Sequence, residues 1–213
     1  MTQPAGHEPN DATSFLPDRH SLKALREAAV ACRGCHLWRH ATQTVFGEGA
    51  AGARVMLVGE QPGDREDREG HPFVGPAGRE LDRALEEAGI DRGAAYVTNV
   101  VKHFKFQERG KRRIHATPKK FEVDACRPWL DEELRVVKPE ALVVLGATAG
   151  KALFGSKFTI RDSRGRPLDS ELAPLVVATI HPSAILRAPD DEARQREREG
   201  LAADLRLVAQ ALG

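Results

Sequence analysis

The chain has 213 residues, of which 41% are hydrophobic and 30% are charged, and its formal net charge is +1. This composition excludes a membrane protein and a wholly disordered chain. No run of about 18 apolar residues is present, and the first 20 residues lack the basic start and apolar stretch of a signal peptide. We therefore expect a cytoplasmic monomer without membrane contact, whose three cysteines stay reduced.

Charge is distributed unevenly along the chain. Residues 102–120 carry eight Lys or Arg against one Glu, whereas residues 60–69 carry five acids against two Arg. A basic and an acidic segment in a nearly neutral chain suggest a polyanionic partner and a catalytic loop, with two solvated loops as the alternative.

Hydrophobic patterning predicts one α/β domain. A polar, flexible N-terminal tail is expected at 1–19, followed by a single domain at 20–213. Four apolar runs predict buried strands, at 53–59, 94–101, 141–146 and 175–180. Helices are expected at 22–32, from Pro76 to Gly89, from a Thr117–Pro118 cap to about Val137, and at 191–212. A further short helix should follow the third strand and end at Gly155, and a loop or small hairpin is expected at 156–174. This alternation predicts a three-layer α/β/α sandwich around a four-stranded parallel sheet.

Polar residues follow the predicted strands. Ligands of such sheets bind beyond the carboxyl ends of the strands, so residues at these ends should converge. The residues in question are Glu60 and Gln61 after the first strand, Asn99 at the end of the second, Gly146 and Ala147 after the third, and His181 and Ser183 after the fourth.

Three motifs have more than one interpretation. GATAGK at 146–151 has three residues between its glycines and Ala152 after its lysine, so it is not a phosphate-binding loop.

Cys32 and Cys35 form a C-x-x-C pair that follows a helix, which favours metal binding over redox chemistry. Cys126 and His103 could complete a Cys₃His set for zinc or for an iron–sulfur cluster, and spacing does not choose between these. Phe73, in a loop between glycines, could stack on a planar ligand or fill the core.

The motifs GEQPG, HPFVGPAG, TNVVK and HPSAILR, in this order, resemble the uracil-DNA glycosylase superfamily, and in particular its iron–sulfur, family 4-like branch. The resemblance implies a DNA-repair enzyme that flips uracil out of DNA, in single strands or also in duplexes, and cleaves the N-glycosidic bond. It implies a catalytic turn with Glu60 and Gln61, stacking of uracil on Phe73, recognition by Gln61 and Asn99, and donation to O2 of uracil by His181. It further implies a wedge at Ala184, Ile185, Leu186 and Arg187, DNA contacts by Ser183 and Arg187, and a [4Fe–4S] cluster on Cys32, Cys35, Cys126 and His103.

Three features depart from the iron–sulfur branch, and one of them, an insertion, resembles its UdgX-type subgroup, which becomes covalently joined to DNA. His103 stands where that branch has a cysteine, and residues 111–115, KRRIH, are an insertion whose Lys111, Arg112 and Arg113 are expected to contact DNA. Gln61 stands where other branches have Asp or Ala, and an amide cannot deprotonate water. We therefore expect His115 to attack C1′ of the sugar and trap the enzyme on its product. The alternatives are a hydrolytic glycosylase that releases an abasic site and a non-catalytic iron–sulfur module that binds damaged DNA.

Overall fold

The computed structural model describes residues 11–213 and confirms the expected parallel sheet. The four strands lie in the order β2-β1-β5-β6, and every neighbouring pair is parallel. Their bounds are β1 (Val55–Gly59), β2 (Tyr96–Asn99), β5 (Ala141–Leu145) and β6 (Leu175–Thr179). Because the chain proceeds from β1 to β2 on one side and later to β5 on the other, the strand order reverses between β1 and β5. Such a switch point opens a crevice at the carboxyl ends of the strands.

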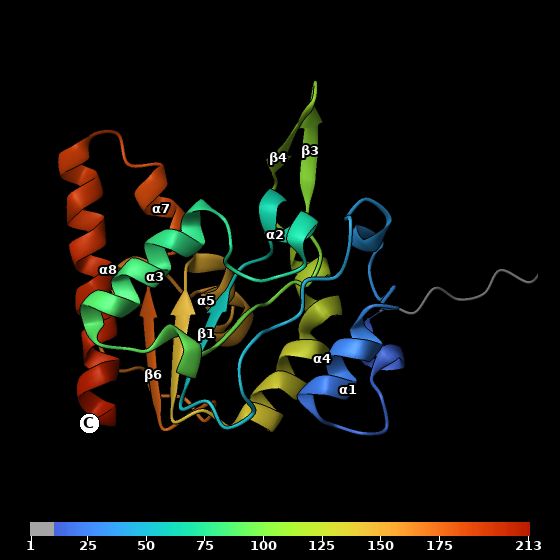
Figure 1. Cartoon of the computed structure of the whole chain (residues 1–213), viewed down its shortest axis with the longest axis horizontal. Coiled ribbons are helices and arrows are strands. Elements are labelled where there is room, and N and C mark those ends of the chain that lie inside the picture. Colours follow the sequence, from blue (N-terminus) through green and yellow to red (C-terminus); the bar gives the residue numbers. More distant parts are fainter. Residues whose placement is uncertain (1–10) are drawn as a thin grey trace, which may run out of the picture.

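Helices cover both faces of the sheet (Figure 1). The principal helices are α1 (Leu22–Ala29), α3 (Pro76–Ala88), α4 (Lys120–Val137), α5 (Ala147–Phe154) and α8 (Asp191–Leu212). Alternate residues of β1 face opposite sides: Met56 shares a core with Trp129 of α4, whereas Leu57 shares the other core with Leu85 of α3. Both faces of the strand are therefore buried, which is why β1 is apolar throughout. None of the helices within residues 11–213 has the length and apolar content needed to cross a membrane.

Several element boundaries differ from the prediction. Helix α1 ends at Ala29, and α4 begins after Lys119 instead of after Thr117. The start of α4 is set by Glu122, whose Oε2 accepts the backbone N–H of Lys119 at 2.5 Å. The segment 156–174, expected to be a loop or hairpin, contains the short helix α6 (Ile160–Ser163).

Part of the expected N-terminal tail, 1–19, packs against the folded domain. Residues 1–10 lie outside the described part of the chain, but a 3-10 helix at Ala12–Phe15 packs against α4. The Asp11 side chain caps it by accepting the N–H of Thr13 at 2.8 Å, and Ala12 is fully buried. Burial of this apolar side chain holds the segment on the core.

The basic and the acidic segment form elements that the sequence analysis missed. Residues 106–115 form a hairpin of β3 (Phe106–Arg109) and β4 (Arg112–His115), which turns at Gly110. Most of the acidic segment forms α2 (Asp64–Glu69). Figure 1 shows the hairpin projecting past α2, on the side of the molecule to which the strands of the sheet point. The hairpin escaped detection because its exposed residues lack the apolar alternation that marks a half-buried strand.

Candidate active site

A cavity of about 770 Å³ opens at the switch point between β1 and β5. Glu60, Asn99 and His181, which follow or end three different strands, all line it. The predicted convergence of strand-end residues is therefore confirmed. Phe73, from the loop before α3, and His115, from the end of β4, line the same cavity. An amide, an aromatic ring and three groups capable of acid–base chemistry thus share one cavity.

The Asn99 side chain presents an unused acceptor. Asn99 is buried, and its Oδ1 has no hydrogen-bond partner among residues 11–213. A Cβ atom on Gly59 would lie 2.5 Å from this Oδ1 and 2.6 Å from Cζ of Phe73, so only glycine lets the amide and the ring approach the strand end together. A buried acceptor without a partner is costly unless a ligand supplies the donor.

Phe73 adopts a backbone conformation that few residues with a side chain adopt. Its φ is +58°, in the left-handed region, and the residue is 6% exposed. The ring lies 5.8 Å from the imidazole of His181, centroid to centroid. Phe73 therefore contributes to the core and also borders the cavity, so both of its interpretations describe part of its role.

The hydrogen bonds of His181 define its tautomer. Its Nδ1 accepts the backbone N–H of Ser183 at 3.2 Å and lies 2.8 Å from the Ser183 hydroxyl oxygen. Burial lowers the pKa of His181 to about 4; Glu60 opposes the shift, and Arg187 and His115 add to it. The ring is therefore neutral at pH 7, and its single proton resides on Nε2 as a donor.

Glu60 interacts with residues on either side. Its Oε2 accepts the Thr148 hydroxyl at 2.5 Å, and its Oε1 lies 3.2 Å from Nε2 of His115. The latter contact is within ion-pair distance but is not aligned as a hydrogen bond. Burial alone would raise the pKa of the Glu60 carboxyl, but His115 and Thr148 outweigh burial and hold it below its usual value. Glu60 is accordingly a carboxylate at neutral pH.

Gln61 lines the cavity, and its amide is hydrogen-bonded to the base of the β3–β4 hairpin. Its Nε2 donates to the carbonyl oxygens of Lys105 and Ala116, at 3.1 and 3.2 Å, and its Oε1 accepts the N–H of Lys105 at 3.0 Å. These two residues flank the β3–β4 hairpin. The side chain therefore clamps the base of the hairpin that carries His115, and the expected recognition of uracil by this amide stays a prediction.

Arg113 also has a role other than the expected DNA contact. Its guanidinium pairs with Asp64 at 2.5 Å and with Asp67 at 2.6 Å, and it lies over the rings of Phe104 and Phe106. The acidic and the basic segment are thus partners of each other, since β4 is held against α2. Lys111 and Arg112, at the tip of the hairpin, are exposed as a DNA contact requires.

The segment after β6 forms α7 (Ser183–Leu186). Arg187 Nη1 donates to the Ser183 hydroxyl at 2.9 Å, which links Arg187 to His181. Leu186 is 44% exposed at the cavity, as a wedge into DNA would be, but Ile185 is fully buried and cannot belong to that wedge.

A buried ion pair behind the site was not predicted from the sequence. Lys102 Nζ lies 2.5 Å from Glu133 Oε2 and also donates to the carbonyl oxygen of Asn99 at 2.7 Å. Glu133 Oε1 accepts the hydroxyls of Tyr96 and Thr98, at 2.8 and 2.9 Å. A lysine three residues after Asn99 and a glutamate on the apolar face of a helix were the available signals, but nothing local to either segment pairs them.

The three cysteines lie near one another, beside the segment that follows β2. Cys32 and Cys126 are buried, and each accepts an N–H donor, from the Trp129 indole at 3.2 Å and from the Lys102 backbone at 3.3 Å. Burial raises the pKa of Cys126 to about 12, with Cys35 and Cys32 adding to the shift. Among residues 11–213, no group of three or more His, Cys, Asp or Glu side chains is arranged to hold a single metal ion. N–H donors to sulfur are, however, typical of iron–sulfur sites.

His103 is buried, and it directly follows Lys102, whose backbone N–H donates to Cys126. Its Nε2 lies 2.9 Å from the Thr44 hydroxyl, whose own proton is donated to the carbonyl oxygen of Ala29 at 3.0 Å. Nε2 must therefore be the donor, which leaves the lone pair on Nδ1. Burial lowers the pKa of His103 to about 4, against the attraction of Asp67, so the ring is neutral, as a metal ligand must be.

A model of the family described as Uracil DNA glycosylase superfamily matches residues 46–206, which is more than half of the chain. The chain belongs to the uracil DNA glycosylase superfamily. The Type-4 uracil-DNA glycosylase of Sulfurisphaera tokodaii is 36% identical over 178 residues, or 80% of this chain and 78% of the relative. The Type-4 uracil-DNA glycosylase of Thermotoga maritima is 37% identical over 175 residues, or 82% of this chain and 88% of the relative. A Type-5 uracil-DNA glycosylase of Pyrobaculum aerophilum is 30% identical over 147 residues, or 62% of each chain.

The family assignment agrees with the location of the site. The matched region begins before β1 and ends within α8, so all four strands and the cavity at their carboxyl ends lie inside it. Cys32 and Cys35 precede the matched region, whereas His103 and Cys126 lie within it.

Proposed function

We propose that this superfamily member excises uracil from DNA and that His115 then traps it on the DNA. The observation that carries the first part is the buried, unpartnered Oδ1 of Asn99 beside Phe73. Uracil carries an N3–H donor next to its O4 acceptor, and a carboxamide complements this pair with one acceptor and one donor. Cytosine has an acceptor at N3 and an amino group at C4, so the same amide would face two mismatched groups.

Cleavage of the bond between N1 of uracil and C1′ leaves the electron pair on the base. Negative charge then grows on O2, where a donor stabilises the transition state more than the substrate. His181 supports this role because its neutral ring directs Nδ1 to Ser183 and keeps its proton on Nε2. A neutral donor leaves no cation for Glu60 to neutralise, so Glu60 remains available to His115 and to the sugar.

The trapping step uses the electrophilic C1′ that the departing base leaves behind. The C1′–N1 bond breaks first and its electron pair leaves with uracil. One ring nitrogen of His115 then donates its lone pair to C1′ and forms a C–N bond. The proton on the other ring nitrogen passes to the Glu60 carboxylate, and the product is a neutral, alkylated imidazole. The 3.2 Å approach of His115 to Glu60 and the clamp of Gln61 on the hairpin support this step, because both restrain the nucleophile. Gln61 itself is an amide and cannot activate water.

His115→Ser tests the proposal on single-stranded uracil DNA. We expect wild type to give a protein–DNA band that survives denaturing electrophoresis, and His115→Ser to lose the band while it still releases uracil. His71→Ser is the matched control, since His71 is exposed and pairs with Glu48 outside the cavity. A band that persists in His115→Ser contradicts trapping by this residue. Intact uracil with wild type contradicts the glycosylase activity itself.

We further propose that Cys32, Cys35, Cys126 and His103 hold a [4Fe–4S] cluster. The donor set suits such a cluster: three thiols, two of which already accept N–H groups, and a neutral imidazole with its lone pair on Nδ1. A four-iron cluster spreads its ligands over four iron atoms, so they need not meet at the single point that one ion requires. The cluster would pin α1 and α4 together behind Asn99.

Iron content tests the ligand set. We expect His103→Cys to retain the iron and the brown absorbance of wild type and His103→Ala to lose much of both. Purified protein that is colourless and contains stoichiometric zinc would contradict the cluster. Equal iron in His103→Ala and wild type would remove His103 from the set.

A further inference from the structure

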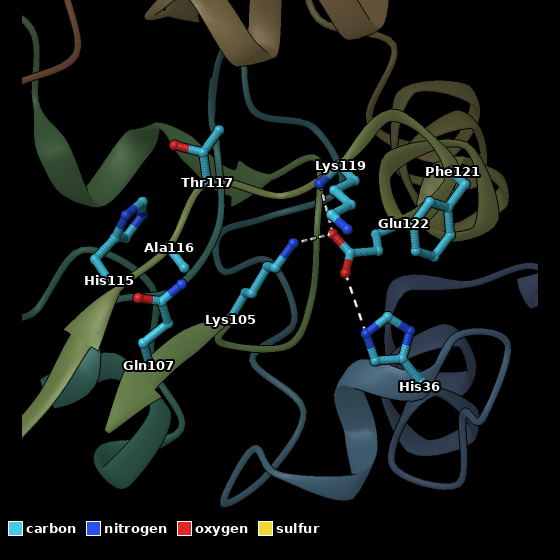
Figure 2. A pocket seen from close by; sticks show the side chains of 9 residues that line it. All are labelled: His36, Lys105, Gln107, His115, Ala116, Thr117, Lys119, Phe121 and Glu122. Carbon is cyan, nitrogen blue, oxygen red and sulfur yellow. Dashed lines mark hydrogen bonds and ion pairs between the residues drawn. The ribbon is translucent and has the colours of Figure 1, made fainter. Parts of the chain in front are cut away.

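A second cavity, of about 520 Å³, lies on the other side of the segment that follows the hairpin. His115 and Thr117 line both cavities, so the two share a wall. Figure 2 shows His115 and Thr117 at one end of the second cavity and Phe121, Glu122 and His36 at the other, with Lys105 and Lys119 between them. None of the functions described above uses this cavity.

The far end of the cavity presents aromatic rings to solvent. Phe121 is 53% exposed, and its ring lies 5.7 Å from that of His36 with an angle of 30° between the planes. Large exposed hydrophobic side chains are few among residues 11–213, and three of the four, Ile114, Phe121 and Leu186, occur on or beside the two cavities. An aromatic ring left in water beside a DNA site is suited to stacking on an unpaired base.

The floor of the cavity is the carboxylate of Glu122, which already accepts hydrogen bonds from surrounding donors. Glu122 is 1% exposed, and its carboxylate accepts the ammonium of Lys105 at 2.8 Å and the backbone N–H of Lys119 at 2.5 Å. Its second oxygen lies 3.2 Å from Nε2 of His36. The charge of Glu122 is therefore neutralised within the protein. The ammonium groups of Lys105 and Lys119 outnumber this carboxylate, so the cavity carries an excess of positive charge.

We propose that this cavity binds the nucleotide next to the uracil in the same DNA strand, with its base on Phe121 and its phosphate near Lys105 and Lys119. The inference rests on the proposed function, because a uracil nucleotide in the first cavity brings its sugar to His115. The strand then has to leave past the shared wall of His115 and Thr117, and the second cavity is what lies beyond it. Stacking accepts any base, so the site would tighten binding without reading sequence. It would also favour a single strand, in which the neighbouring base is not held in a pair.

A fluorescent base tests the stacking directly. 2-Aminopurine is placed on either side of a 2′-fluorinated deoxyuridine, whose glycosidic bond resists cleavage, in a short single-stranded oligonucleotide. We expect wild type to quench the fluorescence at one of the two positions, and Phe121→Tyr to retain the quenching. Phe121→Ala should abolish it and weaken binding about 5- to 140-fold. Val30→Ala, at another exposed hydrophobic side chain, is the matched control.

Two further measurements separate the possible failures. Lys119→Ala should reduce the slope of log affinity against log salt concentration by about 0.7, the value for one phosphate contact on a single strand. Unchanged quenching and affinity in Phe121→Ala overturn the proposed binding of a nucleotide in the second cavity, even if wild type excises uracil normally. Wild type that releases no uracil from the natural substrate overturns the proposed function, whereas the fluorescence experiment needs no cleavage and still reports on the second cavity.

Discussion

Nε2 of His115 lies 3.2 Å from Oε1 of Glu60, although one belongs to the basic hairpin and the other to the turn after β1. The second carboxylate oxygen is held by Thr148, and the pKa of Glu60 lies below its usual value. An ionised carboxylate beside the imidazole stabilises the positive charge that the ring develops during attack. The pair therefore joins the two segments whose opposite charges stand out in the sequence.

Replacement of Glu60 should slow crosslinking. Glu60→Gln keeps the shape but removes the charge and the proton acceptor, so we expect the single-turnover crosslinking rate to fall by about 10²- to 10⁴-fold. Thr148→Val, which removes only the partner of the other oxygen, should have a much smaller effect. Equal crosslinking rates for Glu60→Gln and wild type would contradict the role of this carboxylate.

Replacement of Gln61 should change the product more than the rate of excision. Gln61→Ala removes three hydrogen bonds to the hairpin base, each worth about 1 kcal/mol, and lets His115 move relative to the sugar. We expect the ratio of crosslinked DNA to free abasic DNA to fall about tenfold or more, measured on one gel with and without alkaline cleavage. The clamp would be dispensable if that ratio did not change.

Stability should depend on the ionisation of His181. The folded pKa of about 4 lies below the ordinary value of 6.5, so protons bind the unfolded chain first. The contribution of the neutral ring is fully present above pH 6.5 and is lost as the pH falls toward 4. Linkage predicts a loss of up to about 2 kcal/mol between pH 7 and pH 5, reduced by the solvent that reaches the cavity wall. Urea denaturation of His181→Asn should show a correspondingly smaller change between these pH values, and parallel changes in both proteins would contradict the shift.

The buried pair behind Asn99 should matter for folding. Glu133→Ala leaves the ammonium of Lys102 without its carboxylate in the core, which costs about 3–5 kcal/mol of unfolding free energy. The double variant Lys102→Met with Glu133→Leu removes both charges, and we expect it to regain most of that loss in urea denaturation while excision stays low, because Asn99 has lost the Lys102 contact to its carbonyl oxygen. A single variant as stable as wild type would contradict this account.

The four strands and their order of appearance could be predicted from the sequence because each is a short apolar run buried on both faces. Once the strands are parallel, the position of Glu60, Asn99 and His181 at one edge follows from geometry, without knowledge of any contact. The element boundaries were less accurate. The start of α4 depends on the carboxylate of Glu122, and the end of the N-terminal tail depends on burial of Ala12.

Tertiary structure alone decided what the polar side chains do. Gln61 and Arg113 are residue types suited to uracil and to phosphate, yet one clamps the hairpin and the other pairs with α2. The partner of a polar side chain can come from any segment that folding brings near, so its hydrogen bonds have no signature in the neighbouring sequence. Hydrophobic periodicity is local and can be read along the chain. The pairing of Lys102 with Glu133, or the exposed ring of Phe121 beside His36, exists only after the sheet and helices have packed.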